Sequence, residues 1–366
     1  MSGSACGVGG MSERYRVGVL GATGLVGQRL VSHLEDHPWF QVVALAASDR
    51  SVGLSYREAA RWSLPVDAPP RLWDQKVRAC RPDELKECDF VLSALTSQVA
   101  REVERAFAGA GFAVISNSSA HRQAPDVPLL VPEVNADHLA MVESQRRGSG
   151  GGFIVTNPNC SVAGLIMALA PLHRAFGVRR LVVSTLQALS GAGTDGPRAL
   201  ELVDNVVPWI PGEEEKFEQE TRKMLGSVEG GKFIPADMRV SAHCHRVATL
   251  DGHLQAVSVE LASKATVQQA SRVLSEFRGD VAELELPSSP ERPILVLEEP
   301  DRPQPRLDRD RGDGMSVVVG RLRTCPVFNL RFELLVHNAV RGAAGAASLN
   351  AELLAAREML PRRPAR

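Results

Sequence analysis

Short apolar runs alternate with amphipathic stretches along the first part of the chain. The runs have the length of buried strands and lie at 14–20, 40–48, 88–95, 112–119 and 153–156. Residues 97–111 place apolar side chains at helical spacing, and a second such stretch follows Gly27. Regular alternation of strands and helices predicts a parallel sheet with helices on both faces, which is a Rossmann-type α/β domain.

The pattern changes in the second half of the chain. Strand-like runs lie at 178–191, 254–263, 293–299, 316–323 and 329–338, and fewer helices intervene. This arrangement predicts a mixed α+β domain whose sheet is available as an oligomer interface. The polar, Pro-rich segment 298–314 is expected to form a long surface loop. Residues 339–360 are expected to form a helix that ends in a frayed tail at 361–366.

These patterns predict two domains, as the length of 366 residues also does. The first domain comprises residues 13–157 and is completed by the helix at 339–360. The second domain comprises residues 158–338. The change between them is expected near the Gly-rich loop at 146–152.

Composition narrows the class of protein. With 44% hydrophobic and 23% charged residues, the chain can bury a substantial core. A net charge of −1 favours neither nucleic acid nor a membrane surface as a partner. We detect no membrane-spanning run or signal-peptide pattern, and the six cysteines are scattered without CxxC pairs. We therefore expect a cytoplasmic protein with reduced thiols and a mobile Gly/Ser-rich tail at 1–10.

A glycine-rich turn between the first strand and the first helix is a candidate dinucleotide site. Gly21, Gly24 and Gly27 form GxxGxxG rather than the commoner GxGxxG, and a tight turn without a ligand is the alternative. Its place between a strand and a helix N-terminus suits a pyrophosphate. The expected cofactor contacts in this turn are Gly21, Thr23, Gly24, Leu25 and Val26.

The end of the second strand bears on the choice between NADP and NAD. Ser48, Arg50 and Ser51 offer donors for a 2′-phosphate, whereas Asp49 would suit the ribose hydroxyls of NAD. We expect NADP. An exposed surface cation is the alternative interpretation of Arg50.

Cys160 lies in the stretch TNPNCSVAGLI, where Asn and Pro residues precede an apolar run with helical spacing. It is therefore expected at or beside the first residue of a helix. Unpaired N–H groups and the positive end of the helix dipole would stabilise a thiolate there. A small buried cysteine is the alternative.

Several spaced motifs together resemble one enzyme family. They are GVLGATGLVGQ, NPNCS, TLQALSGAG, GEEEK, HRVATLDGH, RPQPRLDRD and HNAVRGAAG, and the resemblance spans Arg16 to Leu354. In this order they resemble aspartate-β-semialdehyde dehydrogenase, in its archaeal and fungal-like branch. The resemblance implies an NADP-binding first domain and a catalytic and dimerisation second domain, in a homodimer or homotetramer.

The same resemblance implies the reaction. It is the NADP-dependent reductive dephosphorylation of L-aspartyl-4-phosphate to L-aspartate-4-semialdehyde, in lysine, threonine and methionine biosynthesis. A thiolate suits this chemistry, because a thioester accepts hydride and the resulting adduct can expel sulfur. The resemblance makes Cys160 the nucleophile and His253 the general acid/base.

Substrate-binding roles are also implied by the resemblance. Arg246 is expected to bind the substrate α-carboxylate, although Val-Ala follows it where the family often has Val-Pro. Glu213 would hold the ammonium group, with Glu214 and Glu215 as alternatives, and Lys216 the phosphate. An exposed charged helix is the other interpretation of this segment. The remaining expected contacts are Arg122 and Asn159 for the phosphate, Gln187 for the acyl intermediate, and Ser190, Gly191, Gly193 and Asn338 for the nicotinamide.

Other functions compete with this one. An acyl-CoA reductase of the malonyl-CoA type would share the scaffold and the cysteine, but not a tight phosphate pocket. N-acetyl-glutamyl-phosphate reductase shares the chemistry but lacks the GEEEK and RPQPRLDR context. A redox-sensing regulator that binds NADP without turnover is the non-enzymatic alternative. His243 and His245 share one strand face, but without a third ligand we expect no metal site.

Overall fold

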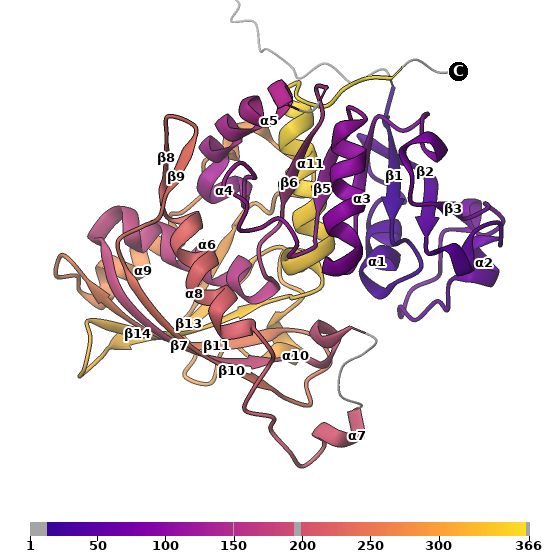
Figure 1. Ribbon diagram of the computed structural model, residues 1–366. Helices are drawn as coiled ribbons and strands as arrows, with labels where there is room; N and C mark the ends of the chain where they lie inside the picture. Colours follow the sequence, from indigo (N-terminus) through magenta and orange to yellow (C-terminus); the bar gives the residue numbers. More distant parts are fainter. Residues whose placement is uncertain (1–12, 149, 194–198, 364–366) are drawn as a thin grey trace, which may run out of the picture.

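Two six-stranded sheets organise the chain in the computed structural model, which describes residues 13–148, 150–193 and 199–363 (Figure 1). The expected tail at 1–10 lies outside the described residues. The first sheet contains β1 (Tyr15–Leu20), β2 (Phe40–Ala47), β3 (Arg78–Ala79), β4 (Phe90–Ser93), β5 (Ala113–Ser116) and β6 (Phe153–Thr156). Its order is β3-β2-β1-β4-β5-β6, and all neighbouring strands are parallel. The predicted Rossmann-type domain is confirmed.

Alternating side chains of these strands enter two separate cores. On β4, Phe90 and Leu92 join one cluster with Leu30 of α1, whereas Val91 joins another with Phe107 of α3. Both faces of the sheet are therefore covered, which explains why its strands read as continuous apolar runs. The helices in this half are α1 (Leu25–His33), α2 (Tyr56–Ala59), α3 (Ser97–Gly109), α4 (Pro132–Asn135) and α5 (Val142–Gly148).

The C-terminal helix returns to the first sheet. A π-helical turn η7 (Val340–Ala344) leads into α11 (Gly345–Ala356), and Leu349 and Leu353 pack into the same cluster as Leu30. This packing supports the proposal that α11 completes the first domain. The expected fraying at 361–366 is wrong for its first part, because the Arg363 N–H donates to Asp89 at 2.8 Å.

The second sheet is mixed, as predicted. It contains β7 (Val178–Gln187), β10 (Arg239–Arg246), β11 (His253–Leu261), β12 (Ile294–Leu297), β13 (Val317–Thr324) and β14 (Leu330–Val336), in the order β10-β7-β11-β14-β13-β12. The β10–β7 and β12–β13 pairs are parallel and the other pairs antiparallel. The helices of this half are α6 (Cys160–Phe176), α7 (Ala199–Leu202), α8 (Glu213–Met224), α9 (Val267–Ser275) and α10 (Pro305–Asp308), and a hairpin joins β8 (Ser227–Glu229) to β9 (Lys232–Ile234).

Helices α6, α8 and α9 pack on one face of this sheet and bury it in a single cluster (Figure 1). The opposite face stays open within the chain, where Val182 and Leu186 of β7 are 37% and 40% exposed. This face is mixed, because Arg180 and Ser184 of β7 lie on it too, and its exposed apolar side chains are available to a partner. This agrees with the expected use of the sheet as an oligomer interface.

The sequence patterns misplace some elements. Helix α9 was not predicted, strand β10 was expected only around His243 and His245, and residues 146–148 belong to α5 rather than to a Gly-rich loop. The expected surface loop at 298–314 contains the short helix α10, whose Asp308 is fully buried and pairs with Arg302. Buried charge of this kind cannot be read from a polar, Pro-rich segment.

Candidate active site

A cavity of about 860 Å³ lies at the carboxyl ends of the first sheet's strands, where it meets α6 and α8. This is the crevice where ligands bind in open parallel sheets. Many of the expected site residues line it together. They are Leu25, Val26, Arg122, Asn159, Cys160, Ser190, Gly191, Gly193, Glu213, Lys216, Arg246 and Asn338.

Cys160 is the first residue of α6, as predicted. The side-chain oxygen of Asn159 caps this helix and accepts from the N–H groups of Ser161 at 2.9 Å and Val162 at 3.3 Å. From η7, Gly342 packs so closely that a Cβ there would lie 2.6 Å from the Cys160 Cβ. The position of the thiol is thus fixed from both sides.

The expected thiolate is not the resting form of this thiol. Burial, and after it the carboxylate of Glu213, raise the pKa of Cys160 to about 12. Arg122, Arg246 and the Ser161 N–H act in the opposite direction but do not compensate. The helix N-terminus is present, and desolvation outweighs it in the free protein.

His253 supplies a ring nitrogen beside the sulfur. It begins β11, is fully buried, and places Nε2 3.2 Å from the Cys160 Sγ. Its Nδ1 accepts from the Ala188 N–H at 2.9 Å. The neutral ring therefore carries its proton on Nε2, facing the sulfur. Burial, Arg246 and His337 hold the pKa of His253 well below its ordinary value, so the ring is neutral at pH 7.

Gly191 lies against both His253 and Arg246. A Cβ on Gly191 would come within 2.9 Å of the His253 ring and 3.0 Å of the Arg246 guanidinium. Arg246 ends β10 and donates to the Ala188 carbonyl at 2.7 Å. Gly191 was expected to make room for a nicotinamide, and in the structure its missing side chain leaves room for His253 and Arg246.

Glu213 is the buried glutamate of the EEE run and the one that lines the cavity. It accepts from Asn159 Nδ2 at 2.7 Å and from Gln187 Nε2 at 3.1 Å. Glu214 instead accepts from the Cys244 N–H, and Glu215 is exposed. This geometry favours Glu213 among the three alternatives.

Gln187 lies behind the cavity rather than on its surface. The side chain is 1% exposed and donates to Glu213 and to Thr185. Its bond positions the glutamate, which differs from the expected contact with an acyl intermediate.

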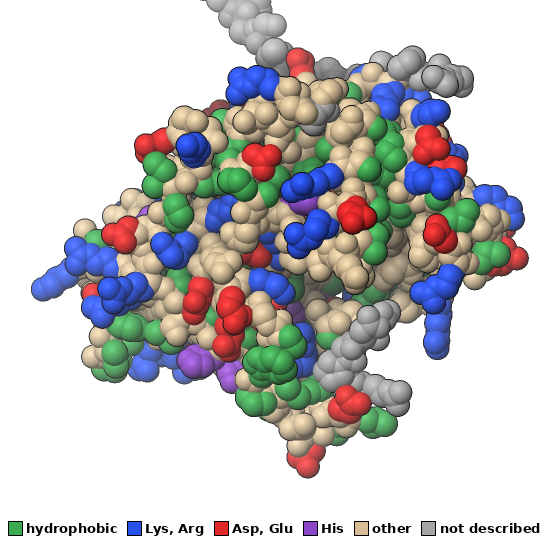
Figure 2. Space-filling view, in the orientation of Figure 1, with side chains coloured by type: hydrophobic (Ala, Val, Ile, Leu, Met, Phe, Trp, Pro, Cys, Tyr) green, Lys and Arg blue, Asp and Glu red, His purple; other side chains and the backbone are tan. Residues whose placement is uncertain are grey.

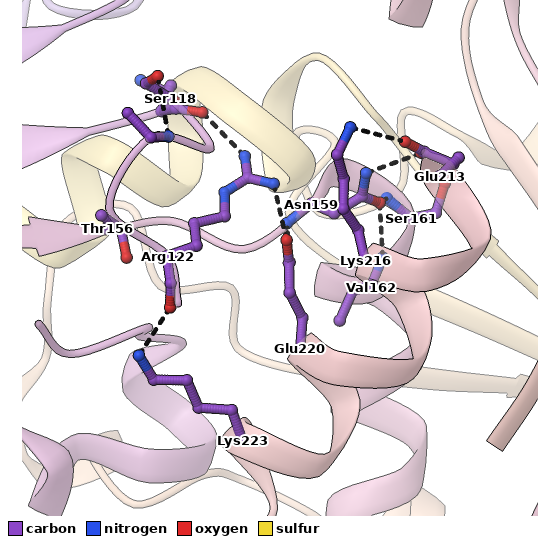
Figure 3. A network of polar contacts seen from close by, with 12 residues as sticks. Ser118, Arg122, Thr156, Asn159, Ser161, Val162, Glu213, Lys216, Glu220 and Lys223 are labelled. Atoms are coloured by element: carbon purple, nitrogen blue, oxygen red, sulfur yellow. Dashed lines mark hydrogen bonds and ion pairs between the residues drawn. The ribbon is translucent and has the colours of Figure 1, made fainter. Parts of the chain in front are cut away.

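Arg122 and Lys216 bring two cations to the same cavity (Figure 3). Lys216 Nζ lies 3.8 Å from Glu213, and Arg122 Nη1 donates to Glu220 at 3.0 Å. Arg122 Nη2 also donates to the Asn117 carbonyl at 2.9 Å. Both cations are held near the thiol and remain close to carboxylates.

A second cavity of about 500 Å³ lies on the other side of the β1–α1 turn. It is lined by Gly21, Thr23 and Gly24, as expected for a dinucleotide site, and by Ser48 at the end of β2. Gly21 has a φ of +76°, which favours glycine. A Cβ on Gly27 would lie 2.2 Å from the Gly21 carbonyl, so the tight turn requires glycine there as well.

The residues expected at the 2′-phosphate are divided in the structure. Arg50 and Ser51 lie in η1 (Asp49–Ser51) and line neither cavity. Arg81, which follows β3, lines the second cavity beside Ser48 and Asp49. The sequence analysis missed Arg81 because β3 contains only two residues.

Asn338 lies at the expected nicotinamide end of the first cavity. It donates to the Ser190 hydroxyl at 2.8 Å and accepts from the Gly252 N–H at 2.8 Å. These bonds fix the amide plane and bring Ser190 and Asn338, both expected cofactor contacts, together.

Glu220 and Lys223 were also missed by the sequence analysis. Glu220 follows Glu213 by two helical turns, and this i, i+7 spacing places both on the same helical face. This spacing could therefore have indicated from the sequence that Glu220 lies on the same side of the helix as Glu213.

Three further observations describe the molecule more broadly. Over residues 13–148, 150–193 and 199–363, no group of three or more His, Cys, Asp or Glu side chains is arranged to hold a metal ion. His245 contacts the Thr185 carbonyl instead.

No helix in those ranges has the length and apolar character to cross a bilayer. Figure 2 shows basic and acidic side chains interspersed over one face.

Comparisons with known proteins test the resemblance. Two family models match the chain, "Semialdehyde dehydrogenase, NAD binding domain" at residues 16–142 and "Semialdehyde dehydrogenase, dimerisation domain" at residues 169–341. An aspartate-semialdehyde dehydrogenase of Archaeoglobus fulgidus is 50% identical over 93% of this chain and 98% of its own. The chain belongs to the aspartate-semialdehyde dehydrogenase family. This confirms the resemblance, which was stated from the motifs.

Fungal members of the family are also similar to this chain in sequence and in structure. The Schizosaccharomyces pombe aspartate-semialdehyde dehydrogenase is 44% identical over 92% of this chain and 97% of its own. A crystal structure of aspartate semialdehyde dehydrogenase with NADP from Candida albicans superposes with a TM-score of 0.89, at 42% identity, covering 95% of this chain and 100% of the other. These archaeal and fungal relatives agree with the predicted branch, with an oxidoreductase, and with NADP as the expected cofactor.

Proposed function

We propose that the protein is an NADP-dependent aspartate-semialdehyde dehydrogenase that reductively dephosphorylates L-aspartyl-4-phosphate to L-aspartate-4-semialdehyde. The observation that carries the proposal is the 3.2 Å approach of the buried His253 Nε2 to the Cys160 thiol, which lines one cavity with Arg122, Lys216 and Arg246. Such an enzyme serves lysine, threonine and methionine biosynthesis. Family membership supports this enzyme over a redox regulator without turnover.

The charges around the thiol match the substrate. Arg246 would bind the α-carboxylate and Glu213 the ammonium group, since each buried charge gains an opposite charge. Arg122 and Lys216 would receive the phosphate. A paired Arg and Lys suits a phosphate dianion better than the neutral thioester of an acyl-CoA, which favours the acyl phosphate.

The two cavities together fit one NADP molecule. They adjoin at Leu95, which lines both, and they lie on either side of the glycine turn. Gly21, Thr23 and Gly24 would cradle the pyrophosphate, Ser48 and Arg81 would lie at the 2′-phosphate, and Ser190 and Asn338 at the nicotinamide. When bound, the nicotinamide supplies a hydride to the thioester carbon.

The residues of the chain would handle the remaining steps. The Cys160 sulfur forms a bond to the acyl carbon, the bond from that carbon to the phosphate oxygen breaks, and the thiol proton leaves with the departing phosphate. Arg122 and Lys216 hold the departing phosphate. After reduction, the Nε2–H of His253 donates a hydrogen bond to the negative oxygen of the thiohemiacetal and stabilises it. The carbon–sulfur bond then breaks as the aldehyde carbonyl forms, and the released thiolate takes up a proton from solvent.

An oligomer is supported by the dimerisation-domain match. We propose that the open face of the second sheet, around Val182, forms the interface of a homodimer or of the dimers in a homotetramer. Sedimentation of Val182→Glu should then show a monomer, because a buried unpaired carboxylate opposes association. We also propose that the protein is cytoplasmic and that its cysteines are reduced.

One assay separates the candidate functions. The protein is incubated with L-aspartate-4-semialdehyde and NADP, and NADPH absorbance is followed with inorganic phosphate, with CoA, or with neither. The proposal predicts turnover that depends on phosphate. Turnover that depends on CoA would identify an acyl-CoA reductase, and cofactor binding without turnover would favour the regulator.

A further inference from the structure

One face of α8 holds two buried charged residues besides the two that line the cavity. Glu213 and Lys216 line the cavity, and Glu220 and Lys223 follow on the same face at i+7 and i+10. Glu220 is 1% exposed and Lys223 is 6% exposed. Neither lines the cavity, yet both contact the elements that do.

Glu220 bridges two separate parts of the site with its two carboxylate oxygens (Figure 3). Oε1 accepts from Arg122 Nη1 at 3.0 Å. Oε2 accepts from the backbone N–H of Asn159 at 2.6 Å. Asn159 caps α6 immediately before the Cys160 thiol, so one side chain fixes both the phosphate-binding cation and the N-cap of the nucleophile helix.

Lys223 holds the backbone of the Arg122 segment in place (Figure 3). Its Nζ donates to the carbonyls of Arg122 at 2.6 Å, Ala124 at 2.9 Å and Val127 at 3.0 Å, and lies 4.2 Å from the Phe233 ring centre. Because the backbone is held independently, loss of Glu220 would leave the guanidinium with only its bond to the Asn117 carbonyl, without releasing the loop. The two anchors on α8 therefore have separable effects.

We propose that Glu220 is a positioning residue that sets where phosphate binds relative to the Cys160 thiol. It does so by orienting Arg122 and the Asn159 amide together, and it touches no substrate itself. This inference rests on the proposed function only for the identity of phosphate as a reactant. It assigns Glu220 no chemical step.

Glu220→Gln tests this role with almost no change in shape. An amide has one acceptor oxygen, and its NH₂ group would meet either Arg122 or the Asn159 N–H donor to donor. One of the two bonds is therefore lost, while the volume is kept. Glu215→Gln is the matched control, because Glu215 is exposed on the same helix.

The readout is phosphate binding beside the thiol, without turnover. Cys160 is alkylated with iodoacetamide at increasing inorganic phosphate, and peptide mass spectrometry follows that residue alone. Phosphate should slow labelling of the wild type, and Glu220→Gln should need about tenfold more phosphate for the same protection, since one charge-assisted bond is lost. Glu215→Gln should match the wild type.

Steady-state kinetics separate positioning from mere loss of folded protein. Glu220→Gln should raise KM for phosphate by about tenfold and leave KM for the semialdehyde within about twofold, because KM does not depend on the folded fraction. In an Arg122→Gln background, Glu220→Gln should add little further change. Unchanged or tighter phosphate binding, or additive effects, would overturn the inference. Absence of wild-type turnover with intact phosphate protection would instead count against the proposed function.

Discussion

At the scale of single residues, Cys160 and His253 form a neutral pair. The Ala188 N–H occupies Nδ1, and burial disfavours both a thiolate and an imidazolium. The pair thus differs from the thiolate–imidazolium ion pair of many cysteine enzymes. Ionisation of the thiol is expected to depend on what binds in the cavity.

This arrangement predicts the pH dependence of Cys160 alkylation in the free protein. Because the thiol pKa is raised to about 12, the thiolate fraction grows with pH throughout the range from 6 to 10. The rate of iodoacetamide labelling at Cys160 should therefore rise continuously over that range. A plateau already reached below pH 7 would show an ion pair and contradict the neutral pair.

At the scale of elements, the contact between η7 and the first turn of α6 sets the position of the nucleophile. Gly342 leaves no space for a methyl group, since its Cβ would lie 2.6 Å from the Cβ of Cys160. The strand–helix turn with Gly21 and the helix start at Cys160 were predictable, because local turn and capping signals mark both. The contact with Gly342 was not, because it joins segments that only the fold brings together.

Gly342→Ala should displace the thiol while leaving the fold intact. We expect kcat to fall by about 100-fold, because displacements near 1 Å at reacting atoms have effects of that size. Gly109→Ala is the control: Gly109 ends α3 with no heavy atom within 4 Å of its Cβ position. Equal activity of the two variants would show that α6 shifts without consequence.

Strand β10 shows the same limit of sequence patterns. Its residues RVSAHCHR include few large apolar side chains, because only alternate positions face α8 and the core. The strand ends at Arg246, which lines the same cavity as the Cys160 thiol. Packing against α8, rather than local propensity, defines this strand.

At the scale of the whole molecule, both six-stranded sheets contribute to the candidate site. The β1–α1 turn and the start of α1 border the two cavities, whereas the expected substrate side chains come from the segment after β5, from α8 and from the end of β10. Both architectures were predictable from hydrophobic periodicity. Arg81 was not, because it reaches the second cavity from a strand of two residues at the edge of the first sheet. We therefore propose that the segment at this edge of the sheet supplies the cation that selects the cofactor.

Arg81→Ala should weaken binding of 2′,5′-ADP by about tenfold, because a charge-assisted contact to the 2′-phosphate is lost. Binding of 5′-AMP, which lacks that phosphate, should stay unchanged in the same calorimetric titration. Arg50→Ala is the comparison variant and should leave both affinities near those of the wild type. The reverse result would restore Arg50 as the selecting residue.

The covalent role of Cys160 can be measured directly by peptide mass spectrometry. The wild-type protein is mixed with L-aspartate-4-semialdehyde and NADP without phosphate, so that an acyl group formed by oxidation has no phosphate to accept it. We predict one acyl group on the peptide containing Cys160, removable by hydroxylamine, together with NADPH. NADPH formation without that adduct, or with the acyl group on another residue, would contradict the mechanism.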